Sequence, residues 1–198
     1  HGDGEQPVDF PQLHISLDAA NILLSKTGFT ISDCQTKIDE KKKPLSMNLA
    51  TKAQIEINAS YEKNARTMNV VAMLEGSDPK LKNEFVVIGA HLDHVGSQAG
   101  LLFPGANDNA SGSAAVLEIA EAFIKGGIQP KRSVIFVLFA SEEQGLNGSK
   151  HFVNSWKKGY DKIAAMINLD CIGYGDSIQV GNGKSAPKLW DIANEIDE

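Results

Sequence analysis

The stretch that decides the fold is FVVIGA, residues 85–90, and it ends at His91-Leu92-Asp93. Two further apolar runs end at acidic residues in the same way: Val134 to Ala140 before Ser141-Glu142-Glu143, and Ile163 to Leu169 before Asp170. Short, continuous apolar runs are typical of parallel strands that are buried on both faces. Open α/β sheets bind ligands at the carboxyl ends of such strands. We therefore expect imidazole and carboxylate groups to gather at one edge of a sheet.

The elements expected from residue 85 onward alternate between strand and helix. They are a strand (85–90), a long loop (91–110), a helix (111–125), a strand (133–140), a helix (about 146–158) and a strand (163–169). Gly126-Gly127 and Pro130 end the first helix. The order is βαβαβ, whose right-handed crossovers place helices over the faces of the sheet. We predict an α/β fold with a mostly parallel sheet flanked by helices on both faces, followed by a short strand (178–180) and a helix (186–198).

The amino-terminal third has a different pattern. A short strand (12–15) leads to a helix that Ser16 caps and Gly28 ends. The polar segment 32–46 contains a lysine run and Pro44, which favours a solvated loop and a domain boundary. Alternation in 53–60 and the run 67–74 predict a hairpin that enters the sheet. We predict two domains, residues 1–46 and 47–198.

Composition excludes several classes of function. The 198 residues are 42% hydrophobic and 22% charged, which suits one full globular core. The net charge is −6 and Lys41-Lys42-Lys43 is the only basic cluster, so we expect no nucleic-acid partner. No apolar run approaches the ~20 residues that cross a bilayer, and the first residues do not resemble a signal peptide. Cys34 and Cys171 are expected to be unpaired, which leaves the redox compartment open. The sequence does not determine the oligomeric state.

The residues at the strand ends are those that bind zinc. Zinc takes neutral imidazole and carboxylate ligands, and a catalytic zinc keeps one position open for water. One imidazole and three carboxylates are candidate ligands: His91, Asp108, Glu143 and Asp170. Each has an ordinary structural explanation by itself, but several carboxylates at one sheet edge repel one another unless a cation is present. We therefore predict a metal pair.

Three neighbouring residues are candidates for supporting roles. Asp93 follows His91 by two positions on an extended segment, so it could accept the proton of the other ring nitrogen and fix the tautomer. Glu142 and Glu143 should diverge at a strand end, so that one binds metal and the other faces the open position and moves protons. His94 could contact substrate, line the cleft or be purely structural.

Four motifs, in order, resemble those of the co-catalytic di-zinc exopeptidases, which include bacterial secreted leucyl aminopeptidases and plasma glutamate carboxypeptidase. They are GAHLDHVG (89–96), PGANDNASG (104–112), SEEQGLNGS (141–149) and NLD (168–170). The resemblance covers residues 85 to about 183. It implies a zinc-exopeptidase (phosphorylase/hydrolase-like) fold, two zinc ions, and an extracellular or periplasmic location of the parent protein. Residues 10 to about 46 are similar to the tail of an inserted protease-associated domain.

The resemblance also implies residue roles. Asp108 would bridge both zinc ions, His91 and Asp170 would complete one site, and Glu143 would bind the other. Glu142 would be the general base that deprotonates the water between the metals, and Asp93 would orient His91. The implied activity is that of an aminopeptidase acting on peptide substrates. A glutaminyl-cyclase-like single-zinc enzyme, or a non-catalytic binding module of the same fold, remains an alternative.

Two features depart from the family pattern. The histidine that completes the second zinc site lies well downstream of the Asp170 position in the family, whereas no histidine follows His151 here. The helices that precede the inserted domain are also missing. We therefore expect an internal piece of a longer enzyme that is incomplete at both ends. Its first site should keep three ligands and bind metal tightly, while the Glu143 site should be weak and peptidase activity close to nil.

Overall fold

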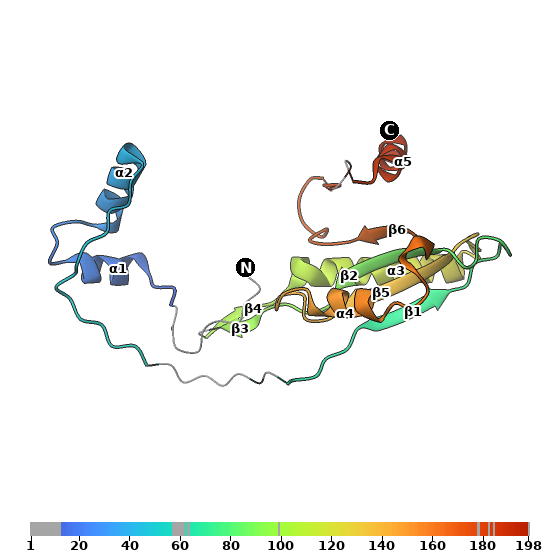
Figure 1. Ribbon diagram of the computed structural model, residues 1–198, viewed down its shortest axis with the longest axis horizontal. Coiled ribbons are helices and arrows are strands. Elements are labelled where there is room, and N and C mark those ends of the chain that lie inside the picture. Colours follow the sequence, from blue (N-terminus) through green and yellow to red (C-terminus); the bar gives the residue numbers. More distant parts are fainter. Residues whose placement is uncertain are drawn as a thin grey trace. The chain divides into compact units, whose positions relative to one another are not determined.

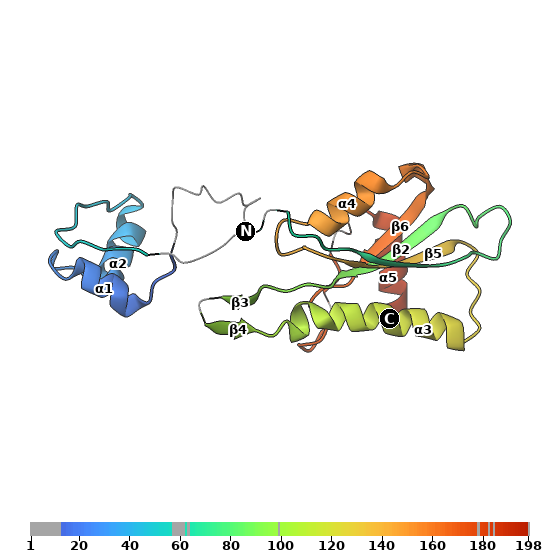
Figure 2. The same ribbon diagram turned by 90° about the horizontal axis from the view of Figure 1, so that it is seen from below.

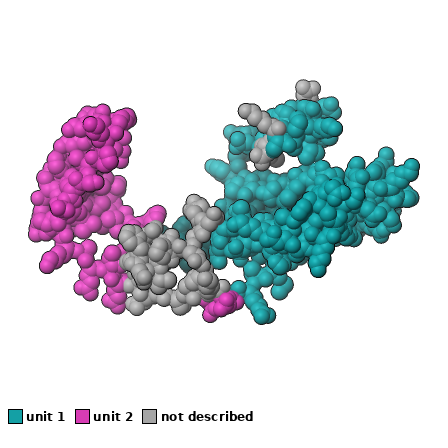
Figure 3. Space-filling model, viewed as in Figure 1, with its two compact units in different colours: residues 1–4, 65–198 teal, residues 5–64 magenta. Residues whose placement is uncertain are grey.

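A computed structural model describes residues 13–56, 62, 64–98, 100–177, 179–181, 183 and 185–197. The chain forms two compact units, which divide between Asn64 and Ala65 (Figure 3). Residues 5–64 are called the first unit (magenta, labelled unit 2 in Figure 3), and the residues from Ala65 onward are called the second unit (teal, labelled unit 1). The domain boundary after residue 46, and the likeness of the first domain to a protease-associated domain, remain predictions. Both cysteines, Cys34 and Cys171, are free as expected.

The first unit contains two short helices. Helix α1 spans Leu17–Leu24, and its N-cap Ser16 accepts a hydrogen bond from the Ala19 amide as predicted. Helix α2 spans Ile31–Lys41, so the prediction of a loop over 32–46 is wrong for this range. The reason is a capping box, in which Thr30 and Asp33 each accept a hydrogen bond from the other's backbone amide. Residues 13–15 form no strand, and Gln12 lies outside the described residues.

The second unit is built on a four-stranded sheet, β1-β5-β2-β6 (Figure 1). Its strands are β1 (Val70–Leu74), β2 (Phe85–His91), β5 (Ser133–Phe139) and β6 (Ile163–Asn168). Strand β2 pairs in parallel with both β5 and β6, while β1 pairs antiparallel with β5. The mostly parallel α/β sheet is therefore confirmed. Because β2 lies between β5 and β6, the three strand ends predicted to carry ligands are adjacent.

Helices cover both faces of this sheet, as predicted (Figure 2). Helix α3 (Gly112–Lys125) packs on one face, where Val116 joins Ile88, Ala90 and Phe136. Helix α4 (Asn147–Ser155) covers the other face, which Phe85, Val87 and Val137 line. On that face the rings of Phe85 and Trp156 meet edge to face at 5.1 Å, and those of Phe139 and Phe152 at 5.8 Å. Apolar burial on both faces explains the uninterrupted apolar sequence of β2 and β5.

The remaining elements include several departures from expectation. The loop over 91–110 contains a two-stranded hairpin, β3 (Gly96–Gln98) with β4 (Leu101–Phe103), and a π-helical turn, η1 (Ala106–Ser111). Strand β1 pairs with β5 and not with a strand at 53–60; residues 53–56 are not in a strand, and 57–60 lie outside the described residues. Residues 179 and 180 form no strand, and Ser177 is the last residue described before them.

Two short elements complete the unit. A 3-10 turn, η2 (Tyr160–Lys162), precedes β6, and helix α5 spans Pro187–Asp197 where a helix was predicted. Among the helices within the described residues, none combines the length and apolar character needed to span a bilayer.

Candidate metal centre

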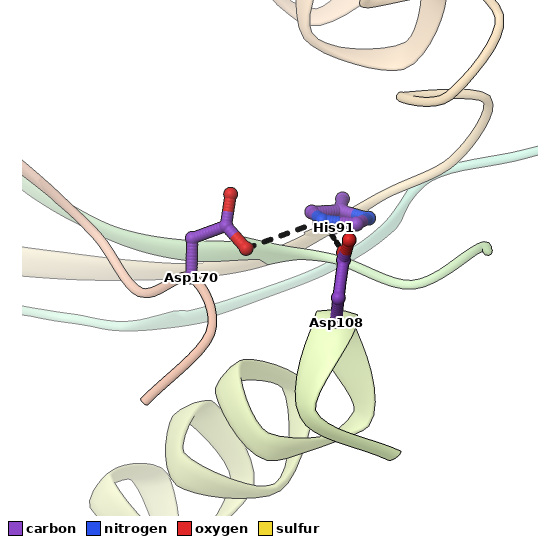
Figure 4. Close-up of side chains that lie close together, drawn as sticks. All are labelled: His91, Asp108 and Asp170. Atoms are coloured by element: carbon purple, nitrogen blue, oxygen red, sulfur yellow. Dashed lines mark ion pairs between the residues drawn. The ribbon is translucent and has the colours of Figure 1, made fainter. Parts of the chain in front are cut away.

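Three elements bring an imidazole and two carboxylates together. His91 is the last residue of β2, Asp108 lies in η1, and Asp170 follows β6 by two residues. The Nε2 atom of His91 lies 3.1 Å from Oδ1 of Asp108 and 3.4 Å from Oδ1 of Asp170 (Figure 4). His91 is only 4% exposed, while both aspartates are nearly half exposed. The three ligand atoms thus meet at the rim of the sheet, as the strand order requires.

His91 is held by contacts on both sides. The buried Ser113 hydroxyl donates to the His91 carbonyl oxygen at 2.9 Å. Nδ1 of His91 lies 3.0 Å from the main-chain carbonyl oxygen of Asp93, which favours the tautomer with the proton on Nδ1 and leaves Nε2 free to bind a metal. The orienting contact was expected from the carboxylate of Asp93. That carboxylate instead accepts hydrogen bonds from the amides of Glu142 and Glu143, at 3.0 and 3.3 Å.

The electrostatics around His91 favour a positive charge. Burial of the ring opposes the imidazolium form, but other groups outweigh it and raise the pKa of His91: the Asp93 carbonyl and the carboxylates of Asp170, Glu142 and Asp108. The same carboxylates would stabilise a bound cation at this position.

A second cluster shares Asp108 with the first. His94, Asp108 and Glu143 place one ligand atom each within 4.8 Å of one another. Nδ1 of His94 lies 2.8 Å from Oε1 of Glu143 and 3.8 Å from Oδ2 of Asp108. Asp108 therefore turns one oxygen toward each cluster, Oδ1 toward His91 and Oδ2 toward His94.

Asn109 ties the Asp108 turn to the segment that carries Asp170. It is 1% exposed, and its Nδ2 donates to the Leu169 carbonyl oxygen at 3.0 Å. Its Oδ1 accepts from the amide of Gly112 at 3.0 Å and from that of Cys171 at 3.4 Å. The peptide bond between Asp108 and Asn109 is cis. Asn109 thereby links the two carboxylates on either side of His91.

Glu142 is beside the first cluster and outside both ligand groups. It lines an open pocket of about 200 Å³ together with His91, Asp170 and Met166. Partial burial is the main cause that raises the pKa of Glu142, and nearby carboxylates add to it, while His91 acts in the opposite direction. A carboxyl group with a raised pKa, next to a candidate metal site and in a pocket, suits proton transfer.

All four predicted ligands and both predicted catalytic residues lie in this region. The structure divides the ligands between two clusters: His91, Asp108 and Asp170 in one, Asp108 and Glu143 in the other. His94 could not be assigned to a cluster from the sequence, and neither Asn109 nor Ser113 was predicted to have a role. Asn109 could have been noticed because it follows Asp108 inside one of the quoted motifs, but an amide side chain in a polar loop sequence gives no sign that it is buried.

The donor atoms suit a divalent transition metal. Imidazole nitrogen and carboxylate oxygen are the ligand types of zinc, and the first cluster offers the three protein ligands of a catalytic site. Donor atoms around a tetrahedral zinc lie roughly 3.4 Å apart. The separations from His91 Nε2, 3.1 and 3.4 Å, match this value. The residues therefore fit the metal that the sequence predicted.

Comparisons with known proteins agree with this chemistry. The profile of Peptidase family M28 matches residues 69–197. An aminopeptidase of Pseudomonas aeruginosa is 42% identical over 125 residues, which are 61% of this chain and 22% of that protein. A probable zinc metalloprotease of Pyrenophora teres is 39% identical over 109 residues, 52% of this chain and 22% of that protein. The solved aminopeptidase from Aneurinibacillus sp. strain AM-1 is 34% identical, with a TM-score of 0.45 over 53% of this chain and 24% of its own. The chain spans about a fifth of the length of these relatives.

Proposed function

The chain belongs to peptidase family M28, and on that premise we propose that it carries the metal centre of a zinc-dependent aminopeptidase. The single observation that carries the proposal is the position of Asp108, whose two carboxylate oxygens face different clusters of candidate ligands. One carboxylate shared between two ligand groups can hold two metal ions close together, as two-metal hydrolytic sites need.

In this proposal His91, Asp108 and Asp170 hold one zinc, and Asp108 and Glu143 contribute to the other. When bound, the metals polarise the scissile carbonyl group and lower the pKa of water. His91 presents Nε2 because its other nitrogen is held by the Asp93 carbonyl oxygen. The Asp93 carboxylate fixes the backbone of Glu142 and Glu143, so the two side chains start from defined positions.

Glu142 is the general base in the proposed reaction. It takes the proton from the attacking water and delivers it to the leaving amine, for which a carboxyl pKa above its ordinary value is favourable. Glu142 shares a pocket with His91 and Asp170, so a scissile bond bound in that pocket would be within its reach. Its side chain is free for this role because it belongs to neither ligand cluster.

The names of relatives support aminopeptidase activity in particular, since the Pseudomonas aeruginosa protein is an aminopeptidase. The shared position of Asp108 favours this reading over a single-zinc cyclase, which needs only one ligand group. The retained carboxylates and His91 argue against a binding module that has lost its ligands.

The test compares two substrates in the enzyme that contains this chain. A leucyl anilide with a free α-amine should be hydrolysed, and its N-acetylated form should not. A chelator should abolish turnover and zinc should restore it. Turnover that survives the chelator, or equal rates on both substrates, would contradict the proposal. Cyclisation of an amino-terminal glutamine with one zinc per protein would identify the alternative.

A further inference from the structure

Asn69, the residue before β1, is joined to both ends of the turn that carries Glu142 and Glu143. Its Oδ1 accepts a hydrogen bond from the Ala140 amide at 3.0 Å, and its Nδ2 donates to the Gly148 carbonyl oxygen at 2.8 Å. These partners are 71 and 79 positions away in the sequence. Asn69 belongs to neither group of candidate metal ligands, and no step of the proposed reaction uses it.

The turn closes between Ala140 and Gly148, and Asn69 binds the backbone groups that this closure leaves over. The Gly148 amide donates to the Ala140 carbonyl oxygen at 2.9 Å. The other two groups, the Ala140 amide and the Gly148 carbonyl oxygen, are those that Asn69 binds. The pairing of β1 with β5 ends at Val70 and Leu138. Beyond this last pair, the side-chain amide of Asn69 therefore takes the place of a backbone peptide group.

The turn has a backbone conformation that two of its residues disfavour. Ser141 and Leu146 have φ values of 52° and 59°, in the left-handed region that residues other than glycine rarely adopt. Such conformations persist where surrounding contacts hold them, and they are common at functional sites. The contact with Asn69 is tight, since a Cβ at Gly148 would overlap both Oδ1 of Asn69 and the Ala140 carbonyl oxygen. Without Asn69, the turn should relax toward a less strained conformation.

We propose that Asn69 is a positioning residue, which fixes the backbone from which Glu142 and Glu143 project. The inference rests on the proposed function, in which Glu142 moves the proton. Asn69 acts through the turn and not by contact with substrate. The amides of Glu142 and Glu143 donate to the Asp93 carboxylate at 3.0 and 3.3 Å, so Asp93 holds the middle of the turn and Asn69 holds its two ends. Loss of Asn69 should therefore impair the chemical step more than substrate binding.

The first test measures amide hydrogen exchange in the enzyme that contains this chain. In Asn69→Ala the amides of Glu142 and Glu143 should exchange about tenfold faster or more, because their bonds to Asp93 open with the turn. Ser133→Ala is the matched control, since Ser133 is buried and its hydroxyl bonds two backbone groups at the other end of β5. It should leave the exchange of both glutamate amides unchanged. An equal rise in exchange in β2 and in the turn of Asn69→Ala would indicate an ordinary structural role and overturn the proposal.

The second test separates kcat from KM for a leucyl anilide. Asn69→Ala should lower kcat by roughly 10- to 100-fold with little change in KM, whereas Ser133→Ala should change neither constant. Asn69→Asp keeps the acceptor for the Ala140 amide and loses the donor to Gly148, so its kcat should be intermediate. This variant decides the question if Asn69→Ala does not fold.

The outcomes separate the two hypotheses. An unaltered kcat in either folded Asn69 variant, or a rise in KM alone, would overturn the positioning role and leave the proposed function intact. An unmodified enzyme that fails to hydrolyse the anilide would overturn the proposed function and, with it, the role of the turn in catalysis.

Discussion

Asp108 is the side chain that belongs to both groups of candidate metal ligands. One oxygen faces His91 and the other faces His94, so the charge of this carboxylate is shared between two ligand groups. Removing it would leave two cations near each other without the anion between them. The remaining ligands of each group, two side chains apiece, fall below the three of a catalytic zinc.

Asp108→Ala should therefore empty both sites together. Metal analysis of the variant after dialysis should find less than one tightly held ion, with the fold of the sheet retained in its circular dichroism. Asp161→Ala is the matched control, because Asp161 is exposed and forms an ion pair with Lys162 beside it. Two tightly held zinc ions in Asp108→Ala would refute the shared role.

Glu142→Gln should separate metal binding from turnover. The change removes a proton carrier without removing a ligand, and general acid-base catalysis typically contributes ~10²–10⁴-fold. We expect the variant enzyme to keep its metal content and to lose hydrolysis of a leucyl anilide by that factor. Glu121→Gln makes the same change in an exposed ion pair of α3 and should have no effect. A near-normal rate in Glu142→Gln would mean that another group is the base.

The residues of the centre differ in how far sequence could identify them. His91, Glu143 and Asp170 follow apolar runs, so strand geometry alone predicted that they would meet. Asp108 came from a motif within a loop. His94 could not be placed, because its position depends on a turn in which Gly105 closes against it. That contact joins residues eleven positions apart through an irregular backbone, which no periodicity reports.

At the scale of elements, the centre depends on how η1 is joined to the end of β6. Asn109 connects the two segments through its side chain. The Nδ2 group donates to the Leu169 carbonyl oxygen, and Oδ1 accepts hydrogen bonds from the amides of Gly112 and Cys171. Asn107 adds a parallel link, because its Oδ1 accepts from the Gly173 amide at 2.8 Å. These bonds add to the strand order in holding the turn that carries Asp108 against the segment that carries Asp170.

Asn109→Ala should weaken both the fold and the metal site. It leaves buried backbone groups without partners, which costs about 1–3 kcal/mol in the free energy of unfolding. Without these hydrogen bonds the carboxylates of Asp108 and Asp170 should be held less firmly next to each other. The dissociation constant for zinc, measured by calorimetry, should therefore rise. Asn154→Ala in the exposed part of α4 should change neither quantity. Unaltered zinc affinity in Asn109→Ala would show that the sheet alone positions the ligands.

Helix α2 gives a pH-dependent prediction. Hydrogen bonds from the backbone amide and then the hydroxyl of Thr30 lower the pKa of Asp33. A lowered pKa means that the ionised carboxylate stabilises the folded state. This contribution is complete above the unfolded pKa and is lost as the pH falls through the folded one. The Thr30 amide resonance should move across that acidic range, and Asp33→Asn should abolish the movement. A pH-independent Thr30 resonance would contradict the capping role.

Sequence predicted the elements of the second unit better than those of the first. Strands β2, β5 and β6 and helices α3 and α4 have strong apolar patterns because both faces of the sheet are covered. Helix α2 was missed because its sequence, ISDCQTKIDEK, is mostly polar, so its formation depends on the Thr30–Asp33 cap and on local pairs such as Gln35 with Asp39. The partner of β1 was missed because β5 is distant in sequence, and local alternation suggested a nearer one.

At the scale of the whole molecule, the candidate ligands all belong to the second unit, Ala65–Glu198, and none to the first. Several carboxylates close together destabilise that unit by mutual repulsion until a cation neutralises them. Metal binding is therefore coupled to the stability of one unit only.

Zinc should raise the unfolding temperature of the second unit and leave the first unchanged. A ligand that binds only the folded state stabilises it by about 2.7 kcal/mol at a free concentration one hundred times its Kd. Backbone amide signals of β2 and β5 should therefore melt at higher temperature with zinc, and a chelator should reverse the shift. Signals of α1 and α2 should melt at the same temperature in both conditions. Asp108→Ala supplies the control, since without the shared carboxylate zinc should stabilise neither unit. A shift that persists in that variant would place the metal elsewhere in the chain.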